Sequence, residues 1–132
     1  MNKKYLQTGA LLGAVTVAIG AFAAHGLKEH LNDYALDIFG KGVTYQFYHT
    51  IAILVTGIVW QSFPNSQLKL AFWFFLAGIL LFSGSLYALA LLVGKGGSPV
   101  PPIGAITPLG GLCFIAGWLF LFVAVNKPGQ GK

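Results

Sequence analysis

Residues 45–60, with the sequence YQFYHTIAILVTGIVW, decide the fold of this chain. They join its densest polar and aromatic cluster, Tyr45–His49, to an apolar run, Thr50–Trp60, that is fit to cross a bilayer. We therefore expect the first half of the chain to lead up to this stretch and the second half to close around it.

The composition leaves too few charges to cover a water-facing surface. Of 132 residues, 56% are apolar and 8% are charged, whereas an ordinary soluble domain carries about 25% charged residues. Every basic residue is a lysine, and most lysines flank apolar runs. The net charge of +5 therefore indicates membrane flanking and excludes a nucleic-acid footprint, which needs clustered Lys and Arg. Cys113 alone cannot form an intrachain disulfide.

Four long apolar runs predict four transmembrane helices. Each run has about the 17–25 residues that a helix needs to cross the hydrocarbon core. Backbone groups in lipid must be satisfied within their own segment, which favours helices over open strands. We predict an all-α integral membrane protein, a single domain over residues 1–132, with helices at about 5–25, 42–63, 68–93 and 103–125. The first run is too long for a typical signal peptide, so we expect it to be retained, with cleavage as the alternative.

The connections between these runs differ in character. Residues 26–41 hold all three acids of the chain, and Asn32 or Asp33 is expected to cap a short helix lying along the membrane interface. Pro64-Asn65 is a turn signal that predicts an antiparallel hairpin of the second and third helices. Residues 94–102 contain three prolines and predict a stiff, irregular loop.

The first helix carries two stripes of small residues, which mark packing faces because small residues let helix backbones approach closely in lipid. Two such faces predict a central position for this helix. One stripe holds Gly9, Gly13, Thr16 and Gly20, and the other holds Ala10, Ala14, Ala18 and Ala21 and continues to His25.

Lysine placement predicts that both termini are cytoplasmic, because that side would then hold five lysines against three on the other. With this topology all four helices bring polar groups to the outer leaflet. A polar group facing lipid is costly, so these groups are expected to face inward. Six of them form the candidate site, which is His25, Tyr45, Gln46, His49, Ser83 and Tyr87, with His25 as the closest partner of Tyr45–His49.

Two interpretations of this cluster stay open. It could fix helix register as a polar network, or it could receive a small amphiphile such as a lipid or a quinone. Haem ligation by His25 and His49 would require the two histidines to oppose each other on facing helices, and no histidine or carboxylate spacing supports a metal site. Ser83-Gly84-Ser85 lacks an orienting acid, so we expect no catalytic residues and no enzyme.

Several motifs resemble those of a known family. They are Gly20-Ala21-Phe22-Ala23-Ala24-His25-Gly26-Leu27, Tyr45-Gln46-x-Tyr48-His49, Phe82–Tyr87 and Thr107–Gly111. Together they resemble the small four-pass family called domain of unknown function 423, which includes YgdD/YwdK-type bacterial proteins and the eukaryotic transmembrane protein 256. Ala23 stands where the family pattern has glycine. The resemblance implies an integral protein of the bacterial inner membrane with four helices, and it implies no established activity.

We therefore expect a non-enzymatic multi-pass membrane protein that contacts membrane lipids and binds no nucleic acid. No cofactor is expected. The alternatives are a haem- or quinone-linked redox or assembly component and a subunit of an oligomeric transporter or channel. The latter would need a homo-oligomer, because one short bundle is too small to enclose a pore.

Overall fold

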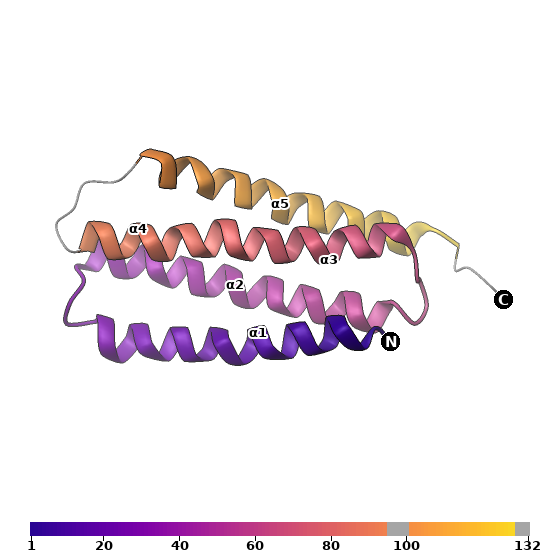
Figure 1. The fold of residues 1–132 in the computed structure, drawn as a ribbon, viewed down its shortest axis with the longest axis horizontal. Coiled ribbons are helices and arrows are strands. Elements are labelled where there is room, and N and C mark those ends of the chain that lie inside the picture. Colours follow the sequence, from indigo (N-terminus) through magenta and orange to yellow (C-terminus); the bar gives the residue numbers. More distant parts are fainter. Residues whose placement is uncertain (95–100, 129–132) are drawn as a thin grey trace.

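Four long helices run antiparallel along one another in the computed structural model, which describes residues 1–94 and 101–128 (Figure 1). Four segments are long and apolar enough to span a membrane, namely Lys3–Leu27, Asp33–Val59, Ser66–Gly94 and Ile103–Asn126. The predicted all-α fold with four spanning helices is confirmed. Of the predicted loop 94–102, residues 95–100 lie outside the described part of the chain.

Two of the four spans contain a π-helical turn. The first span is α1 (Lys3–Phe22) followed by η1 (Ala23–Leu27), and the third is α3 (Ser66–Gly78), η2 (Ile79–Ser83) and α4 (Gly84–Gly94). The second span is the single helix α2 (Asp33–Val59), and the fourth is α5 (Pro101–Asn126). Single π-turns within long helices often occur at functional sites, and here both lie on spans that frame α2.

The polar connection between the first two spans is shorter than the sequence predicted. Asn32 caps α2, because its side-chain oxygen accepts a hydrogen bond of 2.8 Å from the Ala35 backbone N–H. The helix then continues without a break to Val59. The prediction of a separate interfacial helix was wrong, since its residues form the first turns of α2. Ala35, Ile38 and Phe39 in these turns are buried against Leu86 and Ala90 of α4, and this packing draws the segment into the bundle.

The order of the spans across the bundle places α2 at its centre. In Figure 1, α1 lies along one edge, α2 and the third span lie between, and α5 lies along the opposite edge. Helix α2 contacts every other span, whereas α1 packs almost entirely on α2. The prediction that the first helix is central was therefore wrong.

Only one of the two small-residue stripes on α1 is used for packing within the chain. A Cβ on Gly9 would lie 2.6 Å from the Leu54 side chain, and one on Gly20 would lie 3.3 Å from Val43, so the glycine stripe faces α2. The alanine stripe is exposed, and so is His25 at its end. The small residues of the alanine stripe therefore face away from the other described spans.

Aromatic and amide contacts tie the spans together at the end of the bundle that holds the N-terminus. The Tyr5 ring stacks on Phe72 with a centroid distance of 3.9 Å and meets Trp60 edge-on at 5.8 Å. The Asn2 backbone N–H donates to the Gly57 carbonyl at 2.9 Å. Asn65 caps α3 and donates its side-chain amide to the Ala124 carbonyl at 3.0 Å. Asn65 therefore links the turn between α2 and α3, which the sequence predicted, to the last turn of α5.

A glycine-to-alanine change on α5 tests the close approach of α5 to η2. A Cβ on Gly110 would overlap the backbone of Phe82, which cannot move aside as a flexible side chain can. We expect Gly110→Ala to lower the free energy of unfolding by about 1–3 kcal/mol, the usual cost of overpacking. Gly104→Ala is the matched control on the same helix, because a Cβ there meets open space. Thermal unfolding in detergent gives the melting temperature of each variant. Equal melting temperatures for Gly110→Ala and Gly104→Ala would contradict the close packing of α5 on η2.

Candidate functional site

A hydrogen-bonded chain centred on Gln46 connects three of the four spans. The Gln46 amide nitrogen donates to Thr16 Oγ1 of α1 at 2.8 Å, and its amide oxygen accepts from the Tyr87 hydroxyl of α4 at 2.7 Å. Thr16 in turn donates to the Leu12 carbonyl at 2.6 Å. Gln46 is 3% exposed, so its amide lies in the interior of the bundle. Both ends of the amide are therefore used to hold helices together.

The helix backbones come close enough for this chain because small residues lie beside it. A Cβ on Gly42 would lie 2.6 Å from the Tyr87 ring, so glycine is what lets this ring lie against α2. Ser83 donates to the Gly42 carbonyl at 2.7 Å, one turn before Tyr87. Ser85 and Thr107 share a hydrogen bond of 2.6 Å that adds α5 to the polar contacts.

His49 lies on another side of α2 and faces α5. Its Nδ1 is 2.7 Å from the Tyr45 carbonyl, which can only accept, so Nδ1 carries the proton. Its Nε2 is then free to accept the hydrogen bond of 3.1 Å from the Trp118 indole N–H. The imidazole also stacks on Phe114 at a centroid distance of 3.5 Å. The hydrogen bonds thus define a neutral imidazole with both ring nitrogens in use.

The six residues of the predicted site separate into three environments. Gln46, Ser83 and Tyr87 come together at the contact of α2 with the third span. His49 is buried toward α5, and Tyr45 beside it is 40% exposed. His25 is exposed in η1, and it forms no hydrogen bond with another described residue. The structure therefore does not bring His25 to the network as its closest partner.

Two residues that hydrogen-bond to members of the predicted site, Thr16 and Trp118, were not recognised as site residues in the sequence. Thr16 stood out only as part of the glycine stripe on the first helix, where its spacing with Gly13 and Gly20 did point toward a neighbouring helix. Trp118 lies in an otherwise apolar run without any nearby polar residue, so no local signal marked it. Its role depends on the register of α5 against α2.

The chemistry that this arrangement permits is limited. In the described part of the chain, no three His, Cys, Asp or Glu side chains gather closely enough to hold a metal ion. A haem iron could bind His49 only by displacing the Trp118 indole or the Tyr45 carbonyl from its ring. Among the buried side-chain nitrogen and oxygen atoms described, only Thr50 Oγ1 lacks a hydrogen-bond partner. The interior network is thus nearly saturated.

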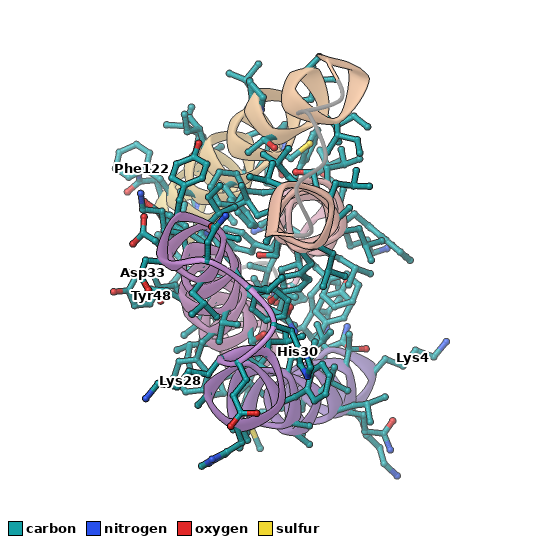
Figure 2. All side chains as sticks on the ribbon, turned by 90° about the vertical axis from the view of Figure 1, so that its left-hand side faces the viewer. Lys4, Lys28, His30, Asp33, Tyr48 and Phe122 are labelled. Atoms are coloured by element: carbon teal, nitrogen blue, oxygen red, sulfur yellow. The ribbon has the colours of Figure 1, made fainter. Side chains whose placement is uncertain are left out.

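The space for a ligand lies in grooves on the lipid-facing surface. One groove, of about 530 Å³, runs between α2 and α5 and is lined by Tyr45, Phe47, Tyr48, His49, Ile51 and Trp118. Figure 2 shows Tyr48, which lines this groove, projecting from the same side of the bundle as Phe122 of α5. Two further grooves, of about 430 and 420 Å³, lie between the first span and α2 and share Gly20 and Val43.

These features define an integral membrane protein with four spans and a closed polar network at the centre of its bundle. The chain belongs to the family described as protein of unknown function (DUF423), whose model matches residues 19–111. The matched segment includes Gln46, His49, Ser83, Tyr87 and Gly110. The family resemblance of the sequence motifs is thereby confirmed.

Relatives in several bacteria share most of the length of the chain. A UPF0382 membrane protein of Staphylococcus aureus strain bovine RF122 / ET3-1 is 39% identical over 125 residues, 95% of this chain and 97% of the relative. The UPF0382 membrane protein YwdK of Bacillus subtilis strain 168 is 36% identical over 126 residues, 95% and 98% of the two chains. One from Haemophilus influenzae strain Rd is 44% identical over 122 residues, 92% of each chain. No solved structure matches.

The comparisons agree with the class of protein that the structure defines. The relatives are named membrane proteins, and the chain has four candidate spans, so it is a multi-pass membrane protein of an uncharacterised family. The family has no assigned function, and neither the family nor the relatives' names point to catalysis.

A double-mutant cycle tests the bridge through Gln46. Tyr87→Phe removes only the hydroxyl, and Gln46→Leu removes the amide that accepts from it. We expect each change to destabilise the bundle and the two effects to be non-additive, with a coupling energy of about 0.6–1.7 kcal/mol, as for other side-chain hydrogen bonds in membranes. The free energy of unfolding of each variant is measured by titration with increasing mole fractions of sodium dodecyl sulfate. Tyr34→Phe is the control, since Tyr34 is 64% exposed, and strict additivity would refute the bridge.

Proposed function

We propose that this protein binds a small amphiphile in the groove between α2 and α5, while its interior polar network fixes the positions of the helices that form the groove. It acts without catalysis, as a binding or assembly component of the membrane. The observation that carries the proposal is the aromatic groove itself, in which tyrosine, phenylalanine and tryptophan side chains and a buried histidine line an open, lipid-accessible space of about 530 Å³.

The saturation of the interior directs ligand binding to the surface. Gln46 uses both ends of its amide, and His49 uses both ring nitrogens, in contacts between helices. A ligand at these atoms would have to break a bond that holds the bundle, at a net cost of about 0.5–1.5 kcal/mol for each bond lost. Tyr45 and Tyr48 require no such exchange, because neither hydroxyl bonds to another described residue.

The groove presents aromatic faces along its length. The Tyr45 and Tyr48 rings meet edge-on at 6.0 Å, and Tyr48 and Trp118 are 57% and 47% exposed. Side chains on a helix lean toward its N-terminus, so both tyrosines point their hydroxyls toward the end of α2 that begins at Asp33. A flat ring with a polar substituent, as in a quinone, fits such walls, because the ring stacks and the substituent accepts a hydrogen bond.

The charge distribution supports the proposed orientation in a bacterial inner membrane. Lys3 and Lys4 begin α1, Lys69 lies in the first turn of α3, and Lys127 follows α5, so all four lie at one end of the bundle. All three acidic residues of the sequence lie between positions 29 and 37, at the other end. By the positive-inside rule, we propose that the lysine-rich end and both termini are cytoplasmic.

The groove is tested by removing only the tyrosine hydroxyls. In a Trp60→Phe/Trp73→Phe background, Trp118 is the remaining tryptophan and reports on the groove by its fluorescence. We expect ubiquinone-2 in phosphatidylcholine vesicles to quench Trp118 saturably. Tyr45→Phe/Tyr48→Phe should raise the half-quenching concentration about tenfold, as two hydrogen bonds of about 0.7 kcal/mol each imply.

Two controls separate binding from collision in the bilayer. Tyr34→Phe removes a hydroxyl of α2 outside the groove and should leave the quenching curve unchanged. Brominated phosphatidylcholine, which quenches by contact with any lipid-facing tryptophan, should give the same quenching in all variants. Linear quenching by ubiquinone-2, with no difference between the variants, would contradict the proposed function.

A further inference from the structure

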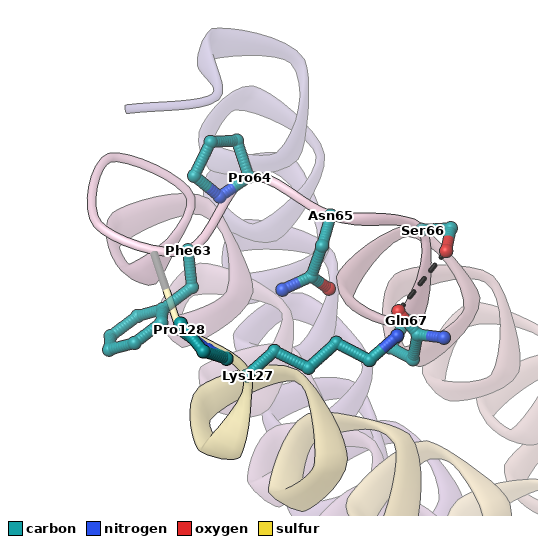
Figure 3. A pocket seen from close by; sticks show the side chains of 7 residues that line it. All are labelled: Phe63, Pro64, Asn65, Ser66, Gln67, Lys127 and Pro128. Carbon is teal, nitrogen blue, oxygen red and sulfur yellow. Dashed lines mark hydrogen bonds between the residues drawn. The ribbon is translucent and has the colours of Figure 1, made fainter. Parts of the chain in front are cut away.

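A pocket of about 430 Å³ lies at the lysine-rich end of the bundle, between the turn joining α2 to α3 and the end of α5. Figure 3 shows its seven lining residues, which come from these two parts of the chain. One part of its wall is apolar and another is polar, and the single charged group is Lys127. The lining residues are Phe63, Pro64, Asn65, Ser66, Gln67, Lys127 and Pro128.

The framework of the pocket is fixed by Asn65. Its side-chain oxygen accepts from the Leu68 backbone N–H at 3.0 Å, and its amide nitrogen donates to the Ala124 carbonyl at 3.0 Å. Both functional groups of Asn65 are therefore engaged in holding the α3 turn against α5. The groups left to donate to a ligand are the Gln67 amide nitrogen and the Lys127 ammonium.

The polar groups are arranged as donors to an anion. The side chain of Lys127 extends across the pocket toward Gln67 in Figure 3. The Ser66 hydroxyl donates to the Gln67 amide oxygen at 3.1 Å, which leaves the Gln67 amide nitrogen as a further donor. Phe63, Pro64 and Pro128 supply the apolar part. This combination suits a molecule with an anionic head and an apolar body.

The surrounding charge favours the same ligand. The N-terminus, Lys3, Lys4 and Lys69 lie at this end, and every acid of the sequence lies between positions 29 and 37 at the other. No Asp or Glu side chain of the sequence therefore lies at this end of the bundle to compete for Lys127. The pocket also lies where α2 ends and α3 begins, at the level where spanning helices meet lipid headgroups.

We infer that this pocket binds the phosphate headgroup of an anionic phospholipid, with Lys127 as the counter-charge and Phe63, Pro64 and Pro128 against the glycerol and upper acyl region. Lysines next to the membrane attract the anionic lipids that are enriched in the cytoplasmic leaflet. This site rests on the orientation proposed above. It shares no residue with the groove between α2 and α5, so it stands or falls independently of ligand binding in that groove.

Competition between two lipids tests the site on the full-length protein. The protein is reconstituted in vesicles of equal parts phosphatidylglycerol and phosphatidylcholine, extracted in mild detergent, and analysed by native mass spectrometry for bound lipid. We expect the wild type to retain phosphatidylglycerol in preference to phosphatidylcholine. Lys127→Gln should reduce this preference about fivefold, and Lys127→Arg should restore it.

Matched variants distinguish a site from general attraction. Lys4→Gln makes the same change of charge at the same end, on an exposed side chain that Figure 2 shows pointing away from the bundle. It should leave the preference within about twofold of the wild type. Equal losses in Lys4→Gln and Lys127→Gln would overturn the site. Full displacement of the bound lipid by millimolar inorganic phosphate would also overturn it as a lipid site.

Discussion

The Gln46 side chain is the constraint on which the rest of the structure depends. One amide donates to α1 and accepts from α4, so the helices on either side of α2 are positioned by the same residue. Lipid supplies little hydrophobic drive for helices to associate, and a buried amide without partners would be costly. The glycines at positions 9, 20 and 42 let the backbones approach closely enough for these bonds to form.

This constraint separates structure from function within one polar cluster. Groups that face the centre of the bundle, such as Gln46 and Ser83, are fully used in contacts between helices. Groups that face the lipid, such as Tyr45 and Tyr48, have hydroxyls free of bonds to other described residues. The two interpretations of the cluster therefore apply to different residues. The network holds the helices, and we propose that the groove beside it receives the ligand.

Hydrophobic length and polar spacing were enough to predict four helices, the hairpin at Pro64-Asn65 and the gathering of Gln46, Ser83 and Tyr87 between the second and third spans. The start of α2 was missed because Asp33, Asp37 and Lys41 made its first turns look interfacial, although their inward face is apolar and buried. The first helix was wrongly predicted to be central, because the sequence does not show which of its two small-residue stripes faces a neighbouring helix and which faces lipid. Trp118 was missed because its pairing with His49 depends on how α5 packs against α2, which no local pattern encodes.

The most direct test of the central claim is the solvent exchange of the Gln46 side-chain amide, measured by NMR on protein with ¹⁵N-labelled glutamine in lipid bilayers. A two-ended bridge between Thr16 and Tyr87 predicts slow exchange at Gln46 compared with the other glutamines, and faster exchange after Tyr87→Phe. Rapid exchange at Gln46 in the wild type, unchanged by Tyr87→Phe, would contradict a bundle held together by this residue.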